Sequence, residues 1–380
     1  MDISSSFSKT IIGWFRENGR ALPWRETKDP YAIWLSEIIL QQTRIAQGWE
    51  YWERFMQQYP MVEALANASE DDVLKLWQGL GYYSRARNLH AAAKQIVALG
   101  SFPNTLEGIK SLKGVGDYTA AAIASFAFDI PAAVVDGNVY RVLSRYFGID
   151  TPINTTQGKK EFAALAESLL PSLNALEKIR PNEFDVELSP VSAYNQGIMD
   201  FGAIQCTPQS PKCLLCPLAE TCEALRNGRV ETLPVKLKTL KVKTRHLTYI
   251  YIRCKEKVSE SNGSLEPLVA IHRRGEGDIW QGLWEPYNAS IHEERSAAAI
   301  AEIQEMLHLE APSLSRLQLL AKDVKHVLTH RILLADFYLL ETDIRPLLPD
   351  DYIWIKESDI ENYGVPRLIE IMLEKLNSMK

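Results

Sequence analysis

Two acidic residues lie in sequence contexts that favour opposite protonation states. Glu37 lies in "YAIWLSEIILQQT" (31–43), where no lysine or arginine stands three or four residues away from it. Burial among such apolar side chains disfavours the charged form and raises the pKa of a carboxyl group. An unpaired acid in an apolar helix is costly, so the pattern favours a functional role for Glu37.

Asp136 lies in "AAVVDGNVYRVLSR" (132–145), after an apolar stretch and directly before a helical pattern. This is the position of a helix N-cap, and capping alone would explain an aspartate there. The helix N-terminus and its N–H groups also favour the charged form, so we expect a lowered pKa. One protonated acid and one carboxylate are the pair that cleavage of a glycosidic bond requires.

Four of the five cysteines lie within "CTPQSPKCLLCPLAETC" (206–222), at Cys206, Cys213, Cys216 and Cys222. The odd number and the clustering argue against a disulfide framework of a secreted protein. Four thiolates on one loop can hold a zinc ion or an iron–sulfur cluster, and the presence of only one short Cys-x2-Cys pair favours the cluster. Such a cluster would either transfer electrons or only hold the loop together.

The stretch "LKGVGDYTA" (112–120) contains Gly114 and Gly116. A dinucleotide-binding fingerprint needs a preceding strand and a third glycine, whereas a helical pattern precedes this stretch and Thr119 occupies the third position. A helix, a glycine turn and a second helix beginning near Asp117 would instead expose backbone N–H groups that suit a phosphate. Seven Lys or Arg against four acidic residues between 81 and 145 support a nucleic-acid phosphate, although a simple turn between packed helices stays an alternative.

The apolar pattern that must position these residues changes along the chain. Spacings of three and four predict helices up to about residue 225. From residue 246 onward, strand-like runs at 246–254, 267–274, 331–340 and 352–357 alternate with helical patterns near 292–308 and 364–378, which predicts an α+β domain. Between them, residues 227–246 carry six Lys or Arg and one Glu, and form either a solvated basic linker or a phosphate contact.

Bulk properties fit a two-domain protein. The chain has 380 residues, of which 46% are apolar, and a formal net charge of −6 that does not exclude a local basic track. The first twenty residues lack the apolar run of a secretion signal, and stretches such as "AAAIASFAF" (120–128) are too short to cross a bilayer. We therefore expect a soluble protein of the cytoplasm or nucleoid, without a signal peptide and without a membrane partner.

Several longer motifs follow one another in a characteristic order: "LPWR" (22–25), "WLSEIILQQT" (34–43), "GLGYYSRARNLH" (79–90), "GVGDYTAAAIAS" (114–125), "VDGNVYRVLSR" (135–145) and "NQGIMDFGAIQC" (195–206). Together with the cysteine loop, they resemble the helix-hairpin-helix DNA glycosylases of the endonuclease III superfamily, and within it the MutY-type adenine DNA glycosylases. The resemblance implies an all-helical glycosylase domain over 1–226, with its hairpin near 105–127 and an iron–sulfur loop at 206–222. A basic linker (227–246) and a Nudix-like α+β domain (247–380) would follow, and the four cysteines would hold a [4Fe–4S] cluster.

The same resemblance implies roles for the two acids. Glu37 would protonate adenine at N7, and Asp136 would stabilise the positively charged sugar, or bond to it transiently, before water completes the hydrolysis. Tyr118 and Asn138 would support this site by hydrogen bonding. Two side chains would fill the gap left in the base stack by the extruded base, Gln42 and Tyr82. The full set of implied substrate and DNA contacts in this domain is Trp24, Arg25, Gln42, Thr43, Leu80, Gly81, Tyr82, Gly114, Gly116 and Gln196.

The C-terminal domain is implied to recognise 8-oxoguanine opposite the adenine. Its residues 328–330, Leu-Thr-His, align with a family signature usually written Phe-Ser-His, so Thr329 keeps a hydroxyl and His330 is retained, while the leucine departs from the usual aromatic residue. Residues 291–307 lack the glycine and the glutamate-rich helix of a Nudix catalytic box, so we expect no pyrophosphohydrolase activity. The expected partner is double-stranded DNA with adenine opposite 8-oxoguanine or guanine, bound by a monomer; repair or replication proteins are possible further partners.

Two other functions compete with this interpretation. An endonuclease III-like pyrimidine-damage glycosylase with lyase activity would use a lysine amine, which the superfamily places where Tyr118 stands. A non-catalytic iron–sulfur DNA-binding protein would not need the pair Glu37 and Asp136. The sequence therefore predicts base removal without strand cleavage.

Overall fold

The computed structural model describes residues 3–172, 178–182, 184, 186–237, 242–255, 266–289 and 317–378. The chain forms two compact units, each described here by itself. The first comprises Met1–Asn67 and Asn88–Lys238, and the second comprises Ala68–Arg87 and Thr239–Lys380. No helix in these described stretches combines the length and the apolar character that crossing a membrane requires.

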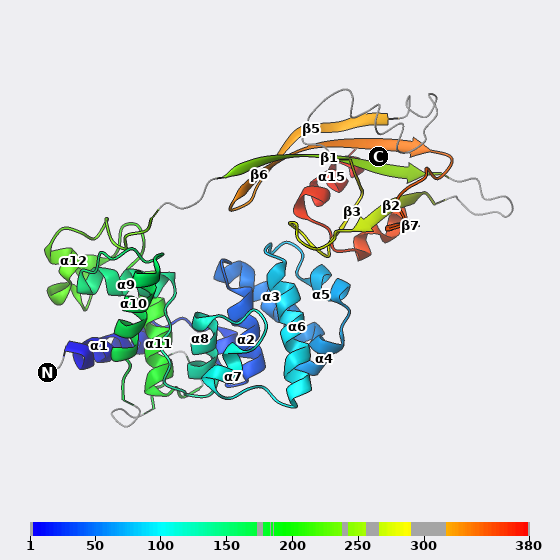
Figure 1. The fold of residues 1–380 in the computed structure, drawn as a ribbon. Helices are drawn as coiled ribbons and strands as arrows, with labels where there is room; N and C mark the ends of the chain where they lie inside the picture. The colour runs from blue at the N-terminus through cyan, green and yellow to red at the C-terminus, as the bar shows by residue number, and fades with distance from the viewer. Residues whose placement is uncertain are drawn as a thin grey trace. The chain divides into compact units, whose positions relative to one another are not determined.

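The first unit is helical, as the sequence predicts (Figure 1). Its helices are α1 (Ile3–Asn18), α2 (Pro30–Ile39), α3 (Ile45–Gln58), α4 (Val62–Asn67), α6 (Ser84–Leu99, which begins in the second unit), α7 (Leu106–Lys110), α8 (Asp117–Ala127), α9 (Gly137–Phe147), α10 (Thr156–Ser168), α11 (Pro190–Asp200) and α12 (Glu223–Arg226). Local sequence sets several boundaries: Asp29 caps α2 and Pro30 follows at its first position, and Ser189 and Pro190 do the same for α11.

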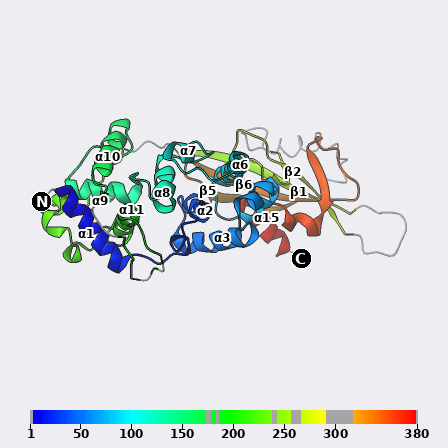
Figure 2. The same cartoon turned by 90° about the horizontal axis from the view of Figure 1, so that it is seen from below.

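Three helices form the interior of this unit. All residues of α2 from Tyr31 to Ile39 are buried, and α8 and α11 are buried over most of their length. Helix α2 contacts α8, and α1 lies beside α11 (Figure 2). A side chain that points inward from α2 is therefore largely shielded from solvent, and Glu37 is one of these buried residues.

The predicted hairpin is formed by α7 and α8. Thr105 caps α7 by accepting a hydrogen bond from the Gly108 N–H (3.1 Å), and α8 begins at Asp117 as expected. Gly114 has a φ of 78°, and a Cβ there would lie 2.6 Å from the Cβ of Asn88. Only glycine fits this turn without a shift of its neighbours.

The second unit contains a mixed sheet with the strand order β3-β2-β1-β6-β5, in which β4 pairs with β1 and β7 with β2. Its strands are β1 (Lys243–Cys254), β2 (Leu268–Arg273), β3 (Trp284–Glu285), β4 (Tyr287–Asn288), β5 (Leu317–Val327), β6 (Arg331–Thr342) and β7 (Tyr352–Lys356). Strands β1 and β6 run parallel, and the other described pairs are antiparallel. Thus the four strand-like runs of the sequence are strands, whereas β3, β4 and β5 were not predicted.

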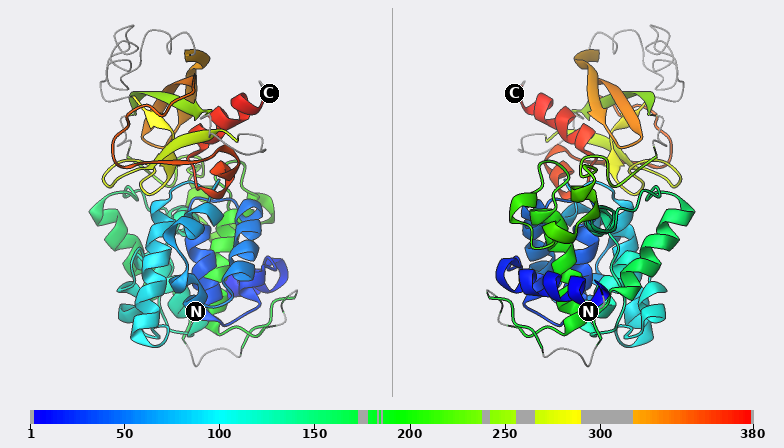
Figure 3. Two further views of the ribbon diagram at one scale, coloured as in Figure 1. Left: turned by 90° about the vertical axis from the view of Figure 1, so that its right-hand side faces the viewer. Right: turned by 90° about the vertical axis from the view of Figure 1, so that its left-hand side faces the viewer.

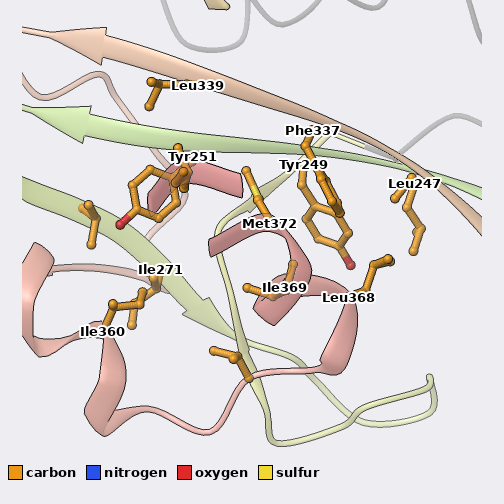
Figure 4. Packing of buried hydrophobic residues seen from close by; sticks show 14 of the residues in the cluster. Leu247, Tyr249, Tyr251, Ile271, Phe337, Leu339, Ile360, Leu368, Ile369 and Met372 are labelled. Atoms are coloured by element: carbon orange, nitrogen blue, oxygen red, sulfur yellow. The ribbon is translucent and has the colours of Figure 1, made fainter. Parts of the chain in front are cut away.

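Helix α15 (Arg367–Asn377) packs against this sheet, as Figure 3 shows from two sides. Leu368, Ile369 and Met372 of α15 face Tyr249 of β1 and Phe337 of β6 (Figure 4). A second cluster of buried side chains contains Ile250 and Leu340. The helix predicted near 364–378 is therefore confirmed, while the one predicted near 292–308 lies outside the described residues.

Residues 68–87 are the part of the second unit that comes from the N-terminal half of the chain. They contain α5 (Glu70–Leu76) and the turn with Leu80, Gly81 and Tyr82. Asp71 accepts a hydrogen bond from Trp284 Nε1 (3.2 Å), and Glu70 accepts one from Arg273 Nη2 (2.9 Å). Parts of the predicted linker (227–246) belong to the two units. Leu233 is buried within the first unit, where its carbonyl accepts a hydrogen bond from Arg145, and β1 of the second unit already begins at Lys243.

Candidate active site

A cavity of about 590 Å³ lies in the first unit, among residues of α2, α8, α11 and the start of α9. It is lined by nine of the residues that the sequence predicts for the site: Trp24, Arg25, Glu37, Gln42, Thr43, Tyr118, Asp136, Asn138 and Gln196. Residues that lie far apart along the chain are therefore brought to one concave surface, whose volume lies in the usual range of small-molecule sites.

Glu37 is 7% exposed and lines the cavity together with Tyr118 and Arg25. Tyr118 donates a hydrogen bond from Oη to Oε2 of Glu37 (2.8 Å). Burial raises the pKa of Glu37 to about 7, although the Tyr118 hydrogen bond and the charge of Arg25 act in the opposite direction. The carboxyl group therefore carries a proton in about half of the molecules near neutral pH, in agreement with the sequence.

Asp136 caps α9, as its sequence context predicts. Its Oδ1 accepts a hydrogen bond from the Val139 N–H (2.8 Å), and its Oδ2 accepts one from Asn138 Nδ2 (2.7 Å). The expected lowering of its pKa was wrong, since burial raises the pKa of Asp136 more than these hydrogen bonds and the charge of Arg141 lower it. The local sequence shows the cap and its donors, but it does not show how much water the fold removes.

Sequence analysis missed Asp200, which holds Arg25 in the cavity wall. Arg25 donates from Nη1 to Asp200 Oδ2 (2.8 Å) and from Nη2 to Oδ1 (3.0 Å), and Arg20 also donates to this carboxylate. Burial raises the pKa of Asp200, but the charges and hydrogen bonds of the two arginines overcome it and leave the pKa well below its ordinary value. Arg25 and Asp200 are 175 positions apart, so no local spacing indicates the pair.

Helix α9 connects the cavity to the cysteine loop through two arginines. Arg141 donates from Nη2 to Asn138 Oδ1 (2.9 Å) and from Nε to the Cys206 carbonyl (2.7 Å). One turn further, Arg145 donates from Nη1 to the Thr207 carbonyl (2.7 Å) and lies 3.4 Å from Cys206 Sγ. The helix that Asp136 caps therefore also fixes the start of the loop.

The four predicted cysteines are half-buried, and their thiols gather in one place. Burial, together with the nearby Cys206, Cys222 and Cys213, raises the pKa of Cys216 to about 11, although the hydrogen bond from the Leu218 N–H acts in the opposite direction. Among the described residues, no three His, Cys, Asp or Glu side chains converge closely enough to hold a single metal ion. Soft thiol ligands of this kind suit an iron–sulfur cluster or a zinc ion.

Three predicted DNA contacts lie on the turn after α5. Leu80 is buried, Gly81 has a φ of 71°, and Tyr82 is 46% exposed with a φ of 48°. The guanidinium of Arg85 lies over the rings of Trp77 and Tyr82, at 5.2 and 5.4 Å from their centroids. Arginine stacking on both rings supports the unusual backbone of this turn.

The two predicted residues of the C-terminal domain, Thr329 and His330, are exposed on the turn between β5 and β6. The hydroxyl of Thr329 forms a hydrogen bond with the hydroxyl of Tyr82, which is 247 positions away. The sequence gives no indication of this contact. It places two hydroxyl-bearing side chains, each predicted to touch DNA, next to one another within the second unit.

The helical unit with its glycine hairpin, its cavity with two buried carboxyl groups and its cysteine loop define a helix-hairpin-helix base excision DNA repair protein. Residues 35–172 match the model of the HhH-GPD superfamily base excision DNA repair proteins. Residues 206–222 match the iron–sulfur binding domain of endonuclease III, and residues 265–375 match the NUDIX domain. The predicted fold class, a helical glycosylase core with a C-terminal Nudix-like α+β domain, is confirmed.

Two relatives identify the family. The adenine DNA glycosylase of Mus musculus is 32% identical over 407 residues, which cover 95% of this chain and 76% of the relative. The adenine DNA glycosylase of Buchnera aphidicola subsp. Baizongia pistaciae is 37% identical over 227 residues, which cover 59% of this chain and 60% of the relative. The chain belongs to the adenine DNA glycosylases, hydrolases of N-glycosyl bonds.

A solved structure supports the fold of part of the chain. It is the structure of a thermostable thymine-DNA glycosylase, 31% identical, with a TM-score of 0.50. The match covers 58% of this chain and 96% of that chain. The fold alone therefore does not determine which base is removed, because relatives named adenine DNA glycosylase and thymine-DNA glycosylase are both similar to this chain.

Proposed function

We propose that the protein removes adenine from pairs with 8-oxoguanine or guanine in double-stranded DNA, by hydrolysis and without cutting the strand. The observation that carries this proposal is the placement of Glu37 and Asp136 in one cavity. Tyr118, which is hydrogen-bonded to Glu37, occupies the position where a lyase would have lysine. The protein would act as a monomer on duplex DNA.

The cavity offers a reason to prefer adenine over thymine. Gln196 donates from Nε2 to Ser192 Oγ (3.1 Å), which fixes its amide, and its Oε1 is buried without a hydrogen-bond partner among the described residues. A buried acceptor of this kind is costly until a donor fills the cavity. The exocyclic amino group of an extruded adenine supplies such a donor, whereas thymine carries the O4 carbonyl oxygen in place of that amino group and has only its ring N3–H to donate.

The chemistry follows from the protonation states of the two acids. Protonated Glu37 donates its proton to N7 of adenine, so the electrons of the N-glycosidic bond can move onto the base. The Asp136 carboxylate then stabilises the positive charge on the sugar, or bonds to it, until water adds. Tyr118 stays neutral, because burial and the charge of Glu37 raise its pKa well above the ordinary value, and it holds Glu37 in place.

Contacts to DNA come from both units. The uncapped N–H groups at the start of α8, after Gly114 and Gly116, would bind a backbone phosphate. Gln42 and Tyr82, the two residues expected to enter the base stack, both have left-handed backbone conformations, with φ of 57° and 48°. Such strain in residues other than glycine is concentrated at functional sites. Thr329, bonded to Tyr82, would contact 8-oxoguanine.

We further propose that Cys206, Cys213, Cys216 and Cys222 hold a [4Fe–4S] cluster, which would tie together the ends of the loop. Because thiolates are the ligands, the raised pKa of Cys216 makes cluster binding release protons. Iron and sulfide analysis of the purified protein, with its visible absorption spectrum, tests this assignment. A stoichiometric zinc content without sulfide would overturn it.

The experiment that tests the function is a single-turnover assay on duplexes with adenine opposite 8-oxoguanine, guanine or thymine, and with thymine opposite guanine. We expect adenine release from the first two duplexes, with strand breaks only after alkali. Strand breaks without alkali, at the rate of base loss, would favour an endonuclease III-like lyase. Release of thymine in preference to adenine would instead favour the activity named for the solved relative.

The pKa of Glu37 predicts the pH dependence of base release. Because the reaction needs Glu37 in its acid form and Asp136 in its charged form, the single-turnover rate constant should fall about fivefold between pH 7 and 8, then about tenfold per unit, and should fall again on the acid side as Asp136, whose pKa is also raised, becomes protonated. Tyr118→Phe removes a hydrogen bond that lowers the pKa of Glu37, so the descending limb should move to higher pH. Tyr31→Phe also removes a buried hydroxyl, one bonded to the Tyr59 carbonyl, and should not move it.

A further inference from the structure

Asp278 is a carboxylate that binds three arginines in the second unit. Its Oδ2 accepts hydrogen bonds from Arg245 Nη1 (2.6 Å) and Arg274 Nη2 (2.7 Å), and its Oδ1 accepts one from Arg331 Nη1 (3.2 Å). Burial raises the pKa of Asp278, but the hydrogen bonds and charges of Arg245 and Arg274 outweigh it and leave the pKa below its ordinary value. The carboxylate is therefore charged at neutral pH.

Arg331 links this carboxylate to the turn that carries Thr329. It is the first residue of β6, and its carbonyl accepts the Leu328 N–H (2.8 Å), which closes the turn. The loop that contains Asp278 also reaches β5 on the other side of the turn, since the Trp280 ring lies 5.9 Å from the His326 ring. Both strands that lead into the turn therefore contact residues 278–280.

The same loop contacts the segment that carries Tyr82. The carbonyl of Gln281 accepts a hydrogen bond from Arg87 Nη1 (2.6 Å), five residues after Tyr82. Gly282 lies against Leu74 of α5, where an added Cβ would be 3.1 Å from Leu74 Cδ1. Residues 278–282 thus contact both the strands that lead into the turn with Thr329 and the segment that carries Tyr82. The hydroxyls of Thr329 and Tyr82 form a hydrogen bond with one another.

We propose that Asp278 is a positioning residue for the recognition of the base opposite adenine, which it serves by fixing the turn with Thr329 relative to Tyr82. This inference rests on the proposed role of Thr329 in contacting 8-oxoguanine. Among the described residues, Asp278 is the only carboxylate paired with Arg245 or Arg331, whereas Arg274 also pairs with Glu285 (2.6 Å). Without the charge of Asp278, the guanidinium groups of Arg245 and Arg331 would repel one another. Arg331 is the first residue of β6, so this repulsion would act directly on the turn.

The test uses the full-length protein with the substitution Asp278→Asn, which keeps the size and an oxygen for the Ile279 N–H (2.7 Å) but removes the charge. The readout is the ratio of single-turnover rate constants for adenine opposite 8-oxoguanine and adenine opposite guanine. We expect this ratio to fall about tenfold, the effect of one misplaced hydrogen bond, while the rate opposite guanine stays within about twofold.

Glu357→Gln is the matched control. Glu357 pairs with Arg253, which lies near the other end of β1 from Arg245, and accepts from its Nε (3.1 Å). This variant loses a carboxylate–arginine pair on the same strand but should keep the ratio of the wild type. Thermal unfolding of the two variants checks that Asp278→Asn is no less folded than the control.

A double-mutant cycle tests whether Asp278 acts through the turn. If it does, Asp278→Asn combined with Arg331→Gln should lower the ratio no further than the stronger single variant. Thr329→Val tests the proposed recognition separately from the role of Asp278, since it removes the proposed contact with 8-oxoguanine itself.

The outcomes that contradict the inference are distinct. If Thr329→Val lowers the ratio but Asp278→Asn does not, Asp278 has no positioning role and the proposed recognition by Thr329 stands. Equal losses in Asp278→Asn and Glu357→Gln, or fully additive losses in the cycle, would also overturn the inference. A wild type without preference for 8-oxoguanine, or an unchanged ratio in Thr329→Val, would contradict the proposed recognition and the inference together.

Discussion

Replacing Glu37 by glutamine should abolish adenine release, with a fall of about a thousandfold in the single-turnover rate constant. Glutamine fills the same space and can still accept the hydrogen bond from Tyr118, but its amide does not deliver a proton to the base. Binding of the duplex should survive, because the proposed phosphate contacts come from the α7–α8 hairpin. A quenched excision assay and a duplex-binding titration measure the two effects separately.

Stability gives an independent check on Glu37→Gln. The folded-state pKa of Glu37 is raised from 4.5 to about 7, so the group destabilises the fold as pH rises through this window, by up to about 3 kcal/mol. Glutamine removes that cost, so at pH 8 the variant should unfold at a higher temperature than the wild type. Glu53→Gln, on the exposed face of α3, should change neither activity nor stability appreciably. Adenine release by the Glu37→Gln protein would show that another group supplies the proton.

Replacing Asp136 by asparagine should also reduce adenine release by about a thousandfold. Asparagine caps helices as well as aspartate does, and its carbonyl oxygen can accept the Val139 N–H in the same way. What it loses is the negative charge that faces the sugar in the proposed mechanism. The variant therefore separates the two roles that the sequence leaves open for Asp136.

Asp29→Asn is the matched control, because Asp29 caps α2 by accepting the Tyr31 N–H (3.0 Å) and does not line the cavity. Neither variant should melt below the wild type, because asparagine keeps each cap and the charge of Asp136 is itself disfavoured by burial. Only Asp136→Asn should lose activity in the excision assay. If it retained activity within about tenfold, capping would be the whole role of Asp136.

The sequence predicts these two acids because their immediate neighbours carry the information. The apolar residues around Glu37 indicate burial, and the helical pattern after Asp136 indicates a cap, and both properties are present in the structure. The sign of the pKa shift at Asp136 was wrong, since it depends on burial by segments far away in the chain. The same limit applies to Asp200, whose partners Arg20 and Arg25 lie more than 170 positions from it.

The strands also differ in how directly the sequence predicts them. The runs that became β1, β2, β6 and β7 are rich in apolar residues, among them β-branched and aromatic ones, and this composition indicates strands directly. Strand β5 contains Lys322, Asp323 and Lys325, and its register shifts between Leu319 and Val324, so the alternation of period two is interrupted. The pairing of Tyr82 with Thr329 depends on this sheet and therefore has no local signature.

The membership of residues 68–87 in the second unit has a consequence for the history of this chain. A gene fusion that joined an ancestral helical protein to a new C-terminal domain would have left α5 to adapt afterwards, for example at Asp71, which now bonds to Trp284. Exchange of C-terminal domains between relatives should accordingly succeed only when residues 68–87, which lie within the matched repair-protein region (35–172), are exchanged together with the domain. Recombination at the linker alone would separate residues 68–87 from the rest of the second unit. The boundary between the two units falls at three points along the chain, after residues 67, 87 and 238.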